Sequence, residues 1–285
     1  MSEPLTESLE DVNRWCSVFE HGWHVDDMVR FLTVPSSIQE LQDALESSRR
    51  WTNRDGRWFP SHAELSNHAH RITLAEEHLR ECLGVISFLA KSHAIVALGI
   101  SGSVAAGVNE ETGDVDLILI ARAGHVWRAR ALAIHLEHHA PGGHRICPNM
   151  VLDERELRLR PSRYAARELA MVRPVSGIHT FNLLWEANPW ATEYLPNASI
   201  RPSISYENVE ESCRAPWWWR WMRTPGLGRI IERWEASRRI RVLSRTSTSD
   251  EATYSRTRCI GHEHGHRARI EASMAELQST RGLEG

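Results

Sequence analysis

Residues 94–121 read AIVALGISGSVAAGVNEETGDVDLILIA, and this stretch decides the expected fold. An apolar run ends in a Ser-Gly-Ser turn, a segment of small residues follows, and a second apolar run begins around Asp114 and Asp116. Residues two apart in a strand point to the same face, so we expect these two carboxylates side by side. Two negative charges at that spacing repel each other unless a cation lies between them.

The residues around this pair suit a substrate that carries phosphate groups. One or two carboxylates, completed by phosphate oxygens and water, are typical ligands of Mg²⁺. The turn at Gly102 and Ser103 offers backbone N–H groups and a hydroxyl to phosphate oxygens directly after a strand. The stretch therefore predicts phosphoryl or nucleotidyl transfer, and the plainer alternative is a solvated turn followed by an edge strand.

The pattern of an apolar residue, Gly102-Ser103, ten residues and Asp114-x-Asp116 resembles the motif of the DNA polymerase beta-type nucleotidyltransferase superfamily. The resemblance implies that Asp114 and Asp116 are catalytic and bind Mg²⁺ or Mn²⁺. It also implies that Gly102 and Ser103 hold the phosphates of a nucleoside triphosphate such as ATP. These roles remain expectations from the resemblance.

The resemblance extends over about residues 10–200 and is most specific at 98–120. It implies an α+β protein with a polymerase-beta-like nucleotidyltransferase core, a small mixed sheet with helices. We expect an N-terminal winged-helix-like unit before this core and a helical C-terminal half after it. The expected boundaries are residues 8–62, 63–155 and 156–285.

Three arginines after the second apolar run are candidates for triphosphate binding. Arg122 ends the run, and Arg128 and Arg130 lie on a helix expected from Val126 onward. Guanidinium groups bind phosphate oxygens in pairs, which favours this role. A solvated helix face explains them equally well.

The position of the general base departs from the superfamily's pattern. Members of the superfamily usually carry a third carboxylate within a later strand, but the candidate strand at 144–153 has Asn149 in its middle and Asp153 at its end. An amide does not accept a proton as a carboxylate does. Asp153 is therefore our first candidate for the base, with Glu168 and Glu186 behind it, unless two carboxylates suffice.

Residues 8–62 predict a helix, a second helix and a hairpin. Ser37 and Glu40 form a capping box that opens the second helix, and Asp55-Gly56 is a hairpin turn. Arginines around the hairpin suggest DNA binding, but the second helix is acidic, which opposes contact with phosphates. We expect a packing or dimerisation role for this winged-helix-like unit.

The remaining motifs support weaker expectations. Residues 65–90 predict the first helix of the core, with His68, His70 and His78 at its surface. The aromatic run at 216–221 predicts a packing anchor more than a surface that stacks on bases. A zinc site is a further, disfavoured possibility, built from Cys259, His262, His264 and His266.

Composition excludes some classes of protein. The 285 residues carry a formal net charge of -3, which demands no polyanionic partner. Five scattered cysteines fit a reduced compartment better than a disulfide framework. Neither a signal peptide nor an apolar run of about 20 residues is evident. We expect a soluble, cytoplasmic chain without a membrane partner.

The favoured hypothesis is a metal-dependent nucleotidyltransferase that moves a nucleoside monophosphate from an NTP to a hydroxyl-type acceptor and releases pyrophosphate. The acceptor is a small molecule or a macromolecule, and nucleic acid is possible but not favoured. The alternative is a non-catalytic nucleotide-sensing or DNA-binding regulatory protein on a degenerate transferase core, which the amide at Asn149 favours.

Overall fold

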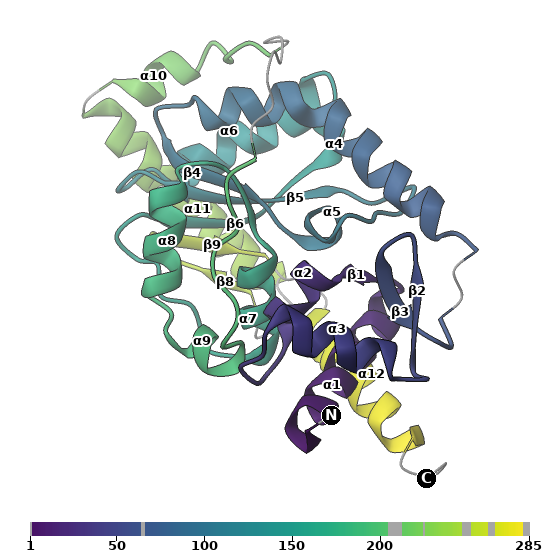
Figure 1. The fold of residues 1–285 in the computed structure, drawn as a ribbon. Coiled ribbons are helices and arrows are strands. Elements are labelled where there is room, and N and C mark those ends of the chain that lie inside the picture. The colour runs from purple at the N-terminus through teal and green to yellow at the C-terminus, as the bar shows by residue number, and fades with distance from the viewer. Residues whose placement is uncertain are drawn as a thin grey trace.

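The computed structural model of the chain is mixed α+β and describes residues 2–63, 66–204, 213–224, 226–246, 252–261 and 266–281 (Figure 1). The first unit contains helices and a small antiparallel sheet in the order β1-β3-β2. Its elements are α1 (Glu3–Phe19), β1 (Trp23–His24), α2 (Val25–Met28), η1 (Val29–Phe31), α3 (Ile38–Glu46), β2 (Trp51–Arg54) and β3 (Arg57–Pro60).

Local sequence signals in this unit are confirmed. The Ser37 hydroxyl accepts the Glu40 N–H, and the Glu40 carboxylate accepts the Ser37 N–H, so the capping box begins α3 as expected. Asp55 and Gly56 both have positive φ, which the tight turn between β2 and β3 requires. Helix α1 was not expected from the sequence.

A second, six-stranded sheet has the order β7-β4-β5-β6-β9-β8 (Figure 1). Strands β5 and β6 are parallel, and every other neighbouring pair is antiparallel. The elements from the first core helix to the third strand of this sheet along the chain are α4 (His68–Ala90), β4 (Ile95–Ile100), α5 (Gly102–Ala106), β5 (Val115–Ala121), α6 (Val126–His139), η2 (Gly143–Arg145) and β6 (Ile146–Asp153).

The C-terminal region is mainly helical, but it also supplies three strands of the large sheet. This differs from the expected helical half, because β7 pairs with β4 and β9 pairs with β6. Its elements are α7 (Arg163–Met171), β7 (Arg173–Ser176), α8 (Ile178–Glu186), α9 (Trp190–Tyr194), α10 (Trp219–Arg223), α11 (Leu227–Thr246), β8 (Thr253–Tyr254), β9 (Arg258–Ile260) and α12 (His266–Arg281).

Strand alternation divides the core into two clusters, one on each face of the large sheet. Leu117 and Leu119 of β5 pack with α4, α6 and α10 on one face. Ile118 and Ile120 point to the other face and join a cluster that includes α1, α7 and α12. Asp116 has the same parity as Ile118, so its side chain lies on the face that meets the N-terminal unit.

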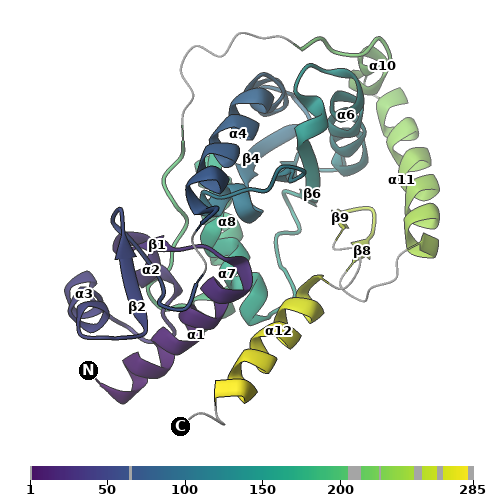
Figure 2. The ribbon, with the colours of Figure 1, turned by 90° about the vertical axis from the view of Figure 1, so that its right-hand side faces the viewer.

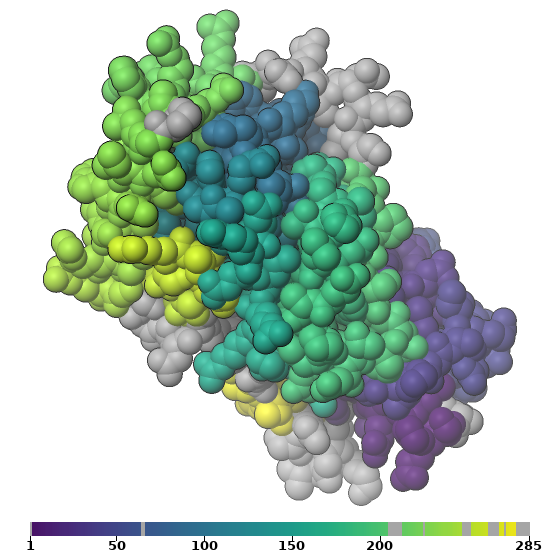
Figure 3. All heavy atoms as spheres, turned by 90° about the vertical axis from the view of Figure 1, so that its left-hand side faces the viewer, coloured from purple at the N-terminus to yellow at the C-terminus, as the bar shows by residue number. Residues whose placement is uncertain are grey.

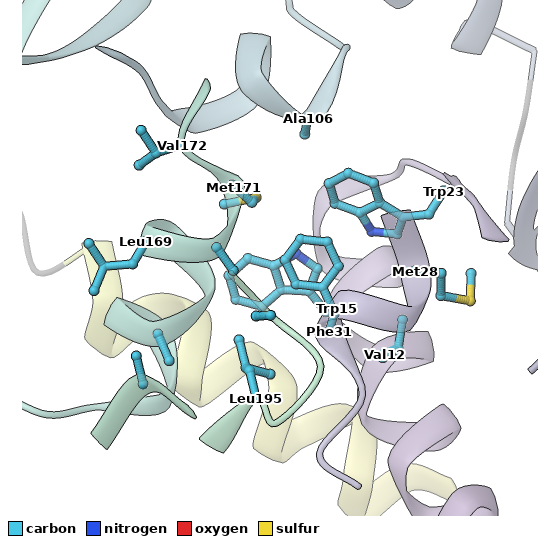
Figure 4. Close-up of a cluster of buried hydrophobic side chains, with 14 of the residues drawn as sticks. Val12, Trp15, Trp23, Met28, Phe31, Ala106, Leu169, Met171, Val172 and Leu195 are labelled. Carbon is cyan, nitrogen blue, oxygen red and sulfur yellow. The ribbon is translucent and has the colours of Figure 1, made fainter. Parts of the chain in front are cut away.

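The N-terminal unit shares its core with the rest of the chain. Figure 4 shows Trp15, Trp23 and Phe31 packed below Ala106 of α5 and beside Met171 of α7. Helix α12 lies along α1, so the last described helix completes the core of the first unit (Figure 2). Within the described residues, no helix is long and apolar enough to cross a bilayer.

Candidate active site

Asp114 and Asp116 lie at the beginning of β5, beside the turn that ends β4. The Ser101 N–H donates to the carbonyl oxygen of Asp116 at 2.9 Å, which ties the turn to the strand. The predicted strand, turn, helix and strand are therefore all present, and the Gly-Ser turn and the two carboxylates come together.

Gly102 is required at this turn for two reasons. Its φ is +64°, a conformation that costs free energy for residues with a side chain. A Cβ at this position would also lie 2.2 Å from Oδ2 of Asp116. The backbone of α5 therefore approaches the carboxylate as closely as glycine alone permits.

The loop between α5 and β5 is held by Asn109, which the sequence did not identify. Its side-chain oxygen accepts the Ser103 hydroxyl at 3.1 Å, and its amide donates to the Gly113 carbonyl oxygen at 3.2 Å. The same amide lies 2.9 Å from Nδ1 of His78, a buried residue of α4 that was expected at the surface. This network fixes Ser103 and the start of β5 relative to each other.

These groups line a cleft of about 640 Å³ between the N-terminal unit and the large sheet. One wall carries Gly102, Ser103, Asp114 and Asp116, and α7 contributes further residues. The opposite wall comes from the end of α1 and the start of α4: Trp15, Val18, Phe19, Glu20, His21 and Arg71.

Among the described residues that line the cleft, the arginine is Arg71. It is not one of the three arginines that the sequence suggested. Its Nη1 donates to the carbonyl oxygens of Phe19 and Glu20 at 3.1 and 2.8 Å, which holds the guanidinium at the cleft. No local sequence signal identifies it, because α4 begins more than thirty residues before the motif.

The protein balances the negative charge of the two aspartates only in part. Burial, and then the charge of Asp114, raise the pKa of Asp116 to about 6. Burial also raises the pKa of Asp114, although Arg145 and His144 oppose this shift. An adjacent cation would relieve the repulsion, and two carboxylates on one strand are a donor set that Mg²⁺ and Mn²⁺ accept.

Glu168 of α7 faces the same cleft. Burial, and then the charge of Asp116, raise the pKa of Glu168 to about 8, and a side-chain hydrogen bond with Tyr164 opposes the shift. Glu168, Tyr164 and Asn149 also line a smaller hollow of about 130 Å³ beside the cleft. Glu186, the other glutamate considered, is exposed on α8 and does not line the cleft.

Asp153 and Arg122 are not part of this site. In the parallel register of β5 and β6, Asp116 pairs with Cys147 while Asp153 pairs with Ala121, so Asp153 lies at the opposite end of the sheet. Its carboxylate accepts the Gly124 N–H and the Arg155 guanidinium. Burial alone would raise the pKa of Asp153, but these hydrogen bonds hold the pKa below its usual value. The predicted base is thus a structural residue.

Arg122 follows β5 at that same end, where its Nε donates to the His93 carbonyl oxygen at 3.1 Å. Arg128 is buried between α6 and α11 and pairs with Glu232 at 3.2 Å. Arg130 lies near Cys259 and lines a separate hollow. None of the three arginines lines the cleft, so the structure does not support their predicted contact with a triphosphate.

The possible zinc site cannot be placed as a unit. His262 and His264 lie outside the described residues, and Cys259 is buried in β9 with a pKa that burial raises. In the part of the chain that the structure describes, no three His, Cys, Asp or Glu side chains group closely enough to hold a metal ion by themselves. A cation at Asp114 and Asp116 would draw further ligands from phosphate and water.

No protein-family model matches the chain, and no curated protein or solved structure shows significant similarity to it.

Proposed function

We propose that the chain is a metal-dependent nucleotidyltransferase with a polymerase-beta-like core and a winged-helix-like N-terminal unit. The observation that carries the proposal is the cleft wall in which Gly102 lies against Asp116, with Asp114 and Ser103 beside them. Two neighbouring carboxylates next to a strand-to-helix turn suit a phosphate chain and its counterion.

In this proposal, Ser103 and the backbone around Gly102 hold the β- and γ-phosphates of an NTP, and Arg71 neutralises part of their charge from the opposite wall. Asp114 and Asp116 would bind Mg²⁺ or Mn²⁺, which supplies charge neutralisation and alignment of the phosphates. The aromatic rings of Trp15 and Phe19 offer the nucleoside an apolar wall.

Transfer requires the acceptor hydroxyl to lose its proton. The acceptor oxygen bonds to the α-phosphorus, the bond to the oxygen that bridges to the β-phosphate breaks, and pyrophosphate leaves. Glu168 receives the acceptor proton in place of Asp153. The charge of Asp116 contributes to the raised pKa of Glu168, so a cation at Asp116 would lower this pKa and favour the carboxylate form that accepts a proton.

The regulatory alternative loses much of its support. Asn149 was its reason, but Glu168 brings a third carboxylate to the same cleft from a helix instead of a strand. The exposed face of α3 also carries Glu40, Asp43 and Glu46, which opposes a phosphate backbone there.

The experiment measures pyrophosphate release from each of the four NTPs with Mg²⁺ and a cell extract as the source of acceptor. Glu168→Gln should lower turnover by about 10²–10⁴-fold, because a positioned general base is lost. Glu186→Gln is the matched control and should leave turnover unchanged. Equal rates for wild type and Glu168→Gln would exclude Glu168 as the base, and no release with any NTP would contradict the proposed activity.

A further inference from the structure

Helices α10 and α11, with the residues that flank them, form a strongly basic surface remote from the cleft. We call residues 213–224 and 226–246 the α10–α11 face. These ranges contain nine arginines and two glutamates, although the whole chain has a formal net charge of -3. Eight of the nine arginines are exposed, and Arg239 is half-buried.

Both glutamates of the α10–α11 face point inward. Glu232 is buried and accepts the N–H groups of Trp127 and Arg128 at 2.8 Å. Glu235 is also buried and pairs with Arg238 and Arg239. Within the two described ranges, no acidic side chain is exposed, so the charged groups at the outer surface are arginines.

Three indole rings stand out of the same face. The exposed fractions are 78% for Trp217, 52% for Trp221 and 63% for Trp234. The guanidinium carbon of Arg238 lies 5.6 Å from the centre of the Trp234 ring, which supports that ring from one side. Trp219, by contrast, is buried, with its ring centre 5.2 Å from that of His93. The aromatic run is therefore both an anchor and a surface.

The pattern of side chains on the α10–α11 face argues against two binding partners, a second copy of the chain and a lipid surface. A symmetric contact with a second copy would bring arginines against arginines, which repel. A helix that lies in a lipid surface separates its apolar side from its charges. On α11, Arg241 and Arg245 instead continue the helical stripe that begins with Ile230 and Trp234.

We propose that the α10–α11 face binds single-stranded nucleic acid without sequence preference. The exposed arginines pair with phosphates, and Trp217, Trp221 and Trp234 stack on bases. Figure 3 shows α10 and α11 in light green at one end of the molecule and the N-terminal unit in purple at the other. This binding surface is separate from the cleft and does not depend on the proposed transfer activity.

The test is fluorescence anisotropy of a labelled oligothymidylate of about 20 nucleotides, titrated with the full chain over a range of salt concentrations and without NTP. Trp217→Ala/Trp234→Ala should weaken binding about tenfold or more, since one stacked base alone has an effect of that order. A plot of the logarithm of the binding constant against the logarithm of the salt concentration has a negative slope. Arg233→Ala/Arg241→Ala should make this slope less steep by about 1.4.

The matched control removes the same charge from the other arginine cluster. Arg49→Ala/Arg54→Ala changes two exposed arginines near the β2–β3 hairpin and should leave both affinity and slope unchanged. Thermal midpoints establish that every variant is folded.

Several results would overturn the proposal. One is that the wild-type chain does not bind the oligonucleotide at low salt. Another is that Arg49→Ala/Arg54→Ala weakens binding as much as the substitutions in the α10–α11 face. Binding to phosphatidylglycerol vesicles without binding to the oligonucleotide would assign the face to a lipid surface. Self-association that Trp217→Ala/Trp234→Ala abolishes would assign it to a second copy.

Discussion

The two ends of strands β5 and β6 hold similar carboxylates in opposite electrostatic states. At one end, Asp114 and Asp116 lie together, and burial and mutual repulsion raise the pKa of Asp116 to about 6. At the other end, Asp153 is fully buried but accepts the Gly124 N–H and the Arg155 guanidinium, which hold its pKa below the usual value. Burial raises the pKa of both Asp116 and Asp153. Their pKa values differ in direction because Asp153 has hydrogen-bond donors around its carboxylate, whereas Asp116 has a second carboxylate beside it.

This difference is the reason for placing the proposed ligand at the end with Asp114 and Asp116. A carboxylate whose hydrogen bonds are complete contributes to stability and has no capacity left for a substrate. A carboxylate pair whose repulsion is only partly offset destabilises the free protein, and a bound ligand can restore the balance. The proposed ligand site is therefore the cleft, and Asp153 lies away from it at the other end of the strands.

A glycine with positive φ lies at each end of the two strands. Gly102→Ala should lower transfer by about 10²-fold, because the new Cβ displaces Asp116 from its place. Gly124 has φ +69°, and no atom of the described residues would lie within 4 Å of an added Cβ, so Gly124→Ala adds only the strain of the backbone. Steady-state rates of pyrophosphate release measure both. Equal losses in the two variants would show that contact with Asp116 is unimportant.

The stability of the two ends should depend on pH in opposite ways. The pKa of Asp153 is lowered, so its contribution is present near neutral pH and disappears as the pH falls through the folded pKa. Asp153→Asn should therefore lower the thermal midpoint by about 2–8 °C at pH 7 and by little in acid, since a broken buried hydrogen bond costs about 1–3 kcal/mol.

Asp116→Asn should behave in the reverse manner. The raised pKa of Asp116 means that wild type is stabilised below pH 3.8, and this contribution is lost as the pH rises through about 6. Without divalent cations, the variant should be more stable than wild type at pH 7 and equal to it in acid. Thermal midpoints of both variants and wild type, measured from pH 3 to 7, test these two predictions. If each variant differed from wild type by the same amount at every pH, the assigned pKa directions of Asp153 and Asp116 would be contradicted.

Arg122 gives the smallest expected effect. Its side chain is exposed beside β5 at the Asp153 end, so Arg122→Ala should leave the affinity for NTP within twofold of wild type. Isothermal titration calorimetry with ATP and Mg²⁺ measures the affinity of Arg122→Ala and of wild type. A tenfold loss of affinity would mean that the phosphates extend to this end of the sheet.

Local patterns in the sequence predicted the parts of the fold that they determine. The Ser-Gly-Ser turn, the Asp114 and Asp116 pair, the capping box at Ser37 and the hairpin at Asp55-Gly56 all depend on spacing within a few residues. Alternation along β5 also predicted that the two carboxylates share a face.

The rest of the site depends on packing between distant segments. Glu168 reaches the cleft because α7 packs against the same cluster as α1. Arg71 of α4 is held there by carbonyl oxygens at the end of α1, and no local pattern encodes either contact. The prediction for Asp153 was wrong because alternation along a strand shows only which face a residue lies on. How far Asp153 lies from Asp116 depends on the register between β5 and β6, which the sequence does not show. The short strands β7, β8 and β9 are two to four residues long, too short for a periodic signal.

The most direct test of the central claim is the thermal midpoint with ATP, with Mg²⁺, and with both together. Wild type should rise by about 5–10 °C only with both, at a ligand concentration about a hundredfold above Kd. Asp114→Asn/Asp116→Asn should show no such rise, although it folds and is at least as stable as wild type without ligand. A double variant that keeps the full rise would contradict the assignment of this carboxylate pair to a metal and nucleotide site.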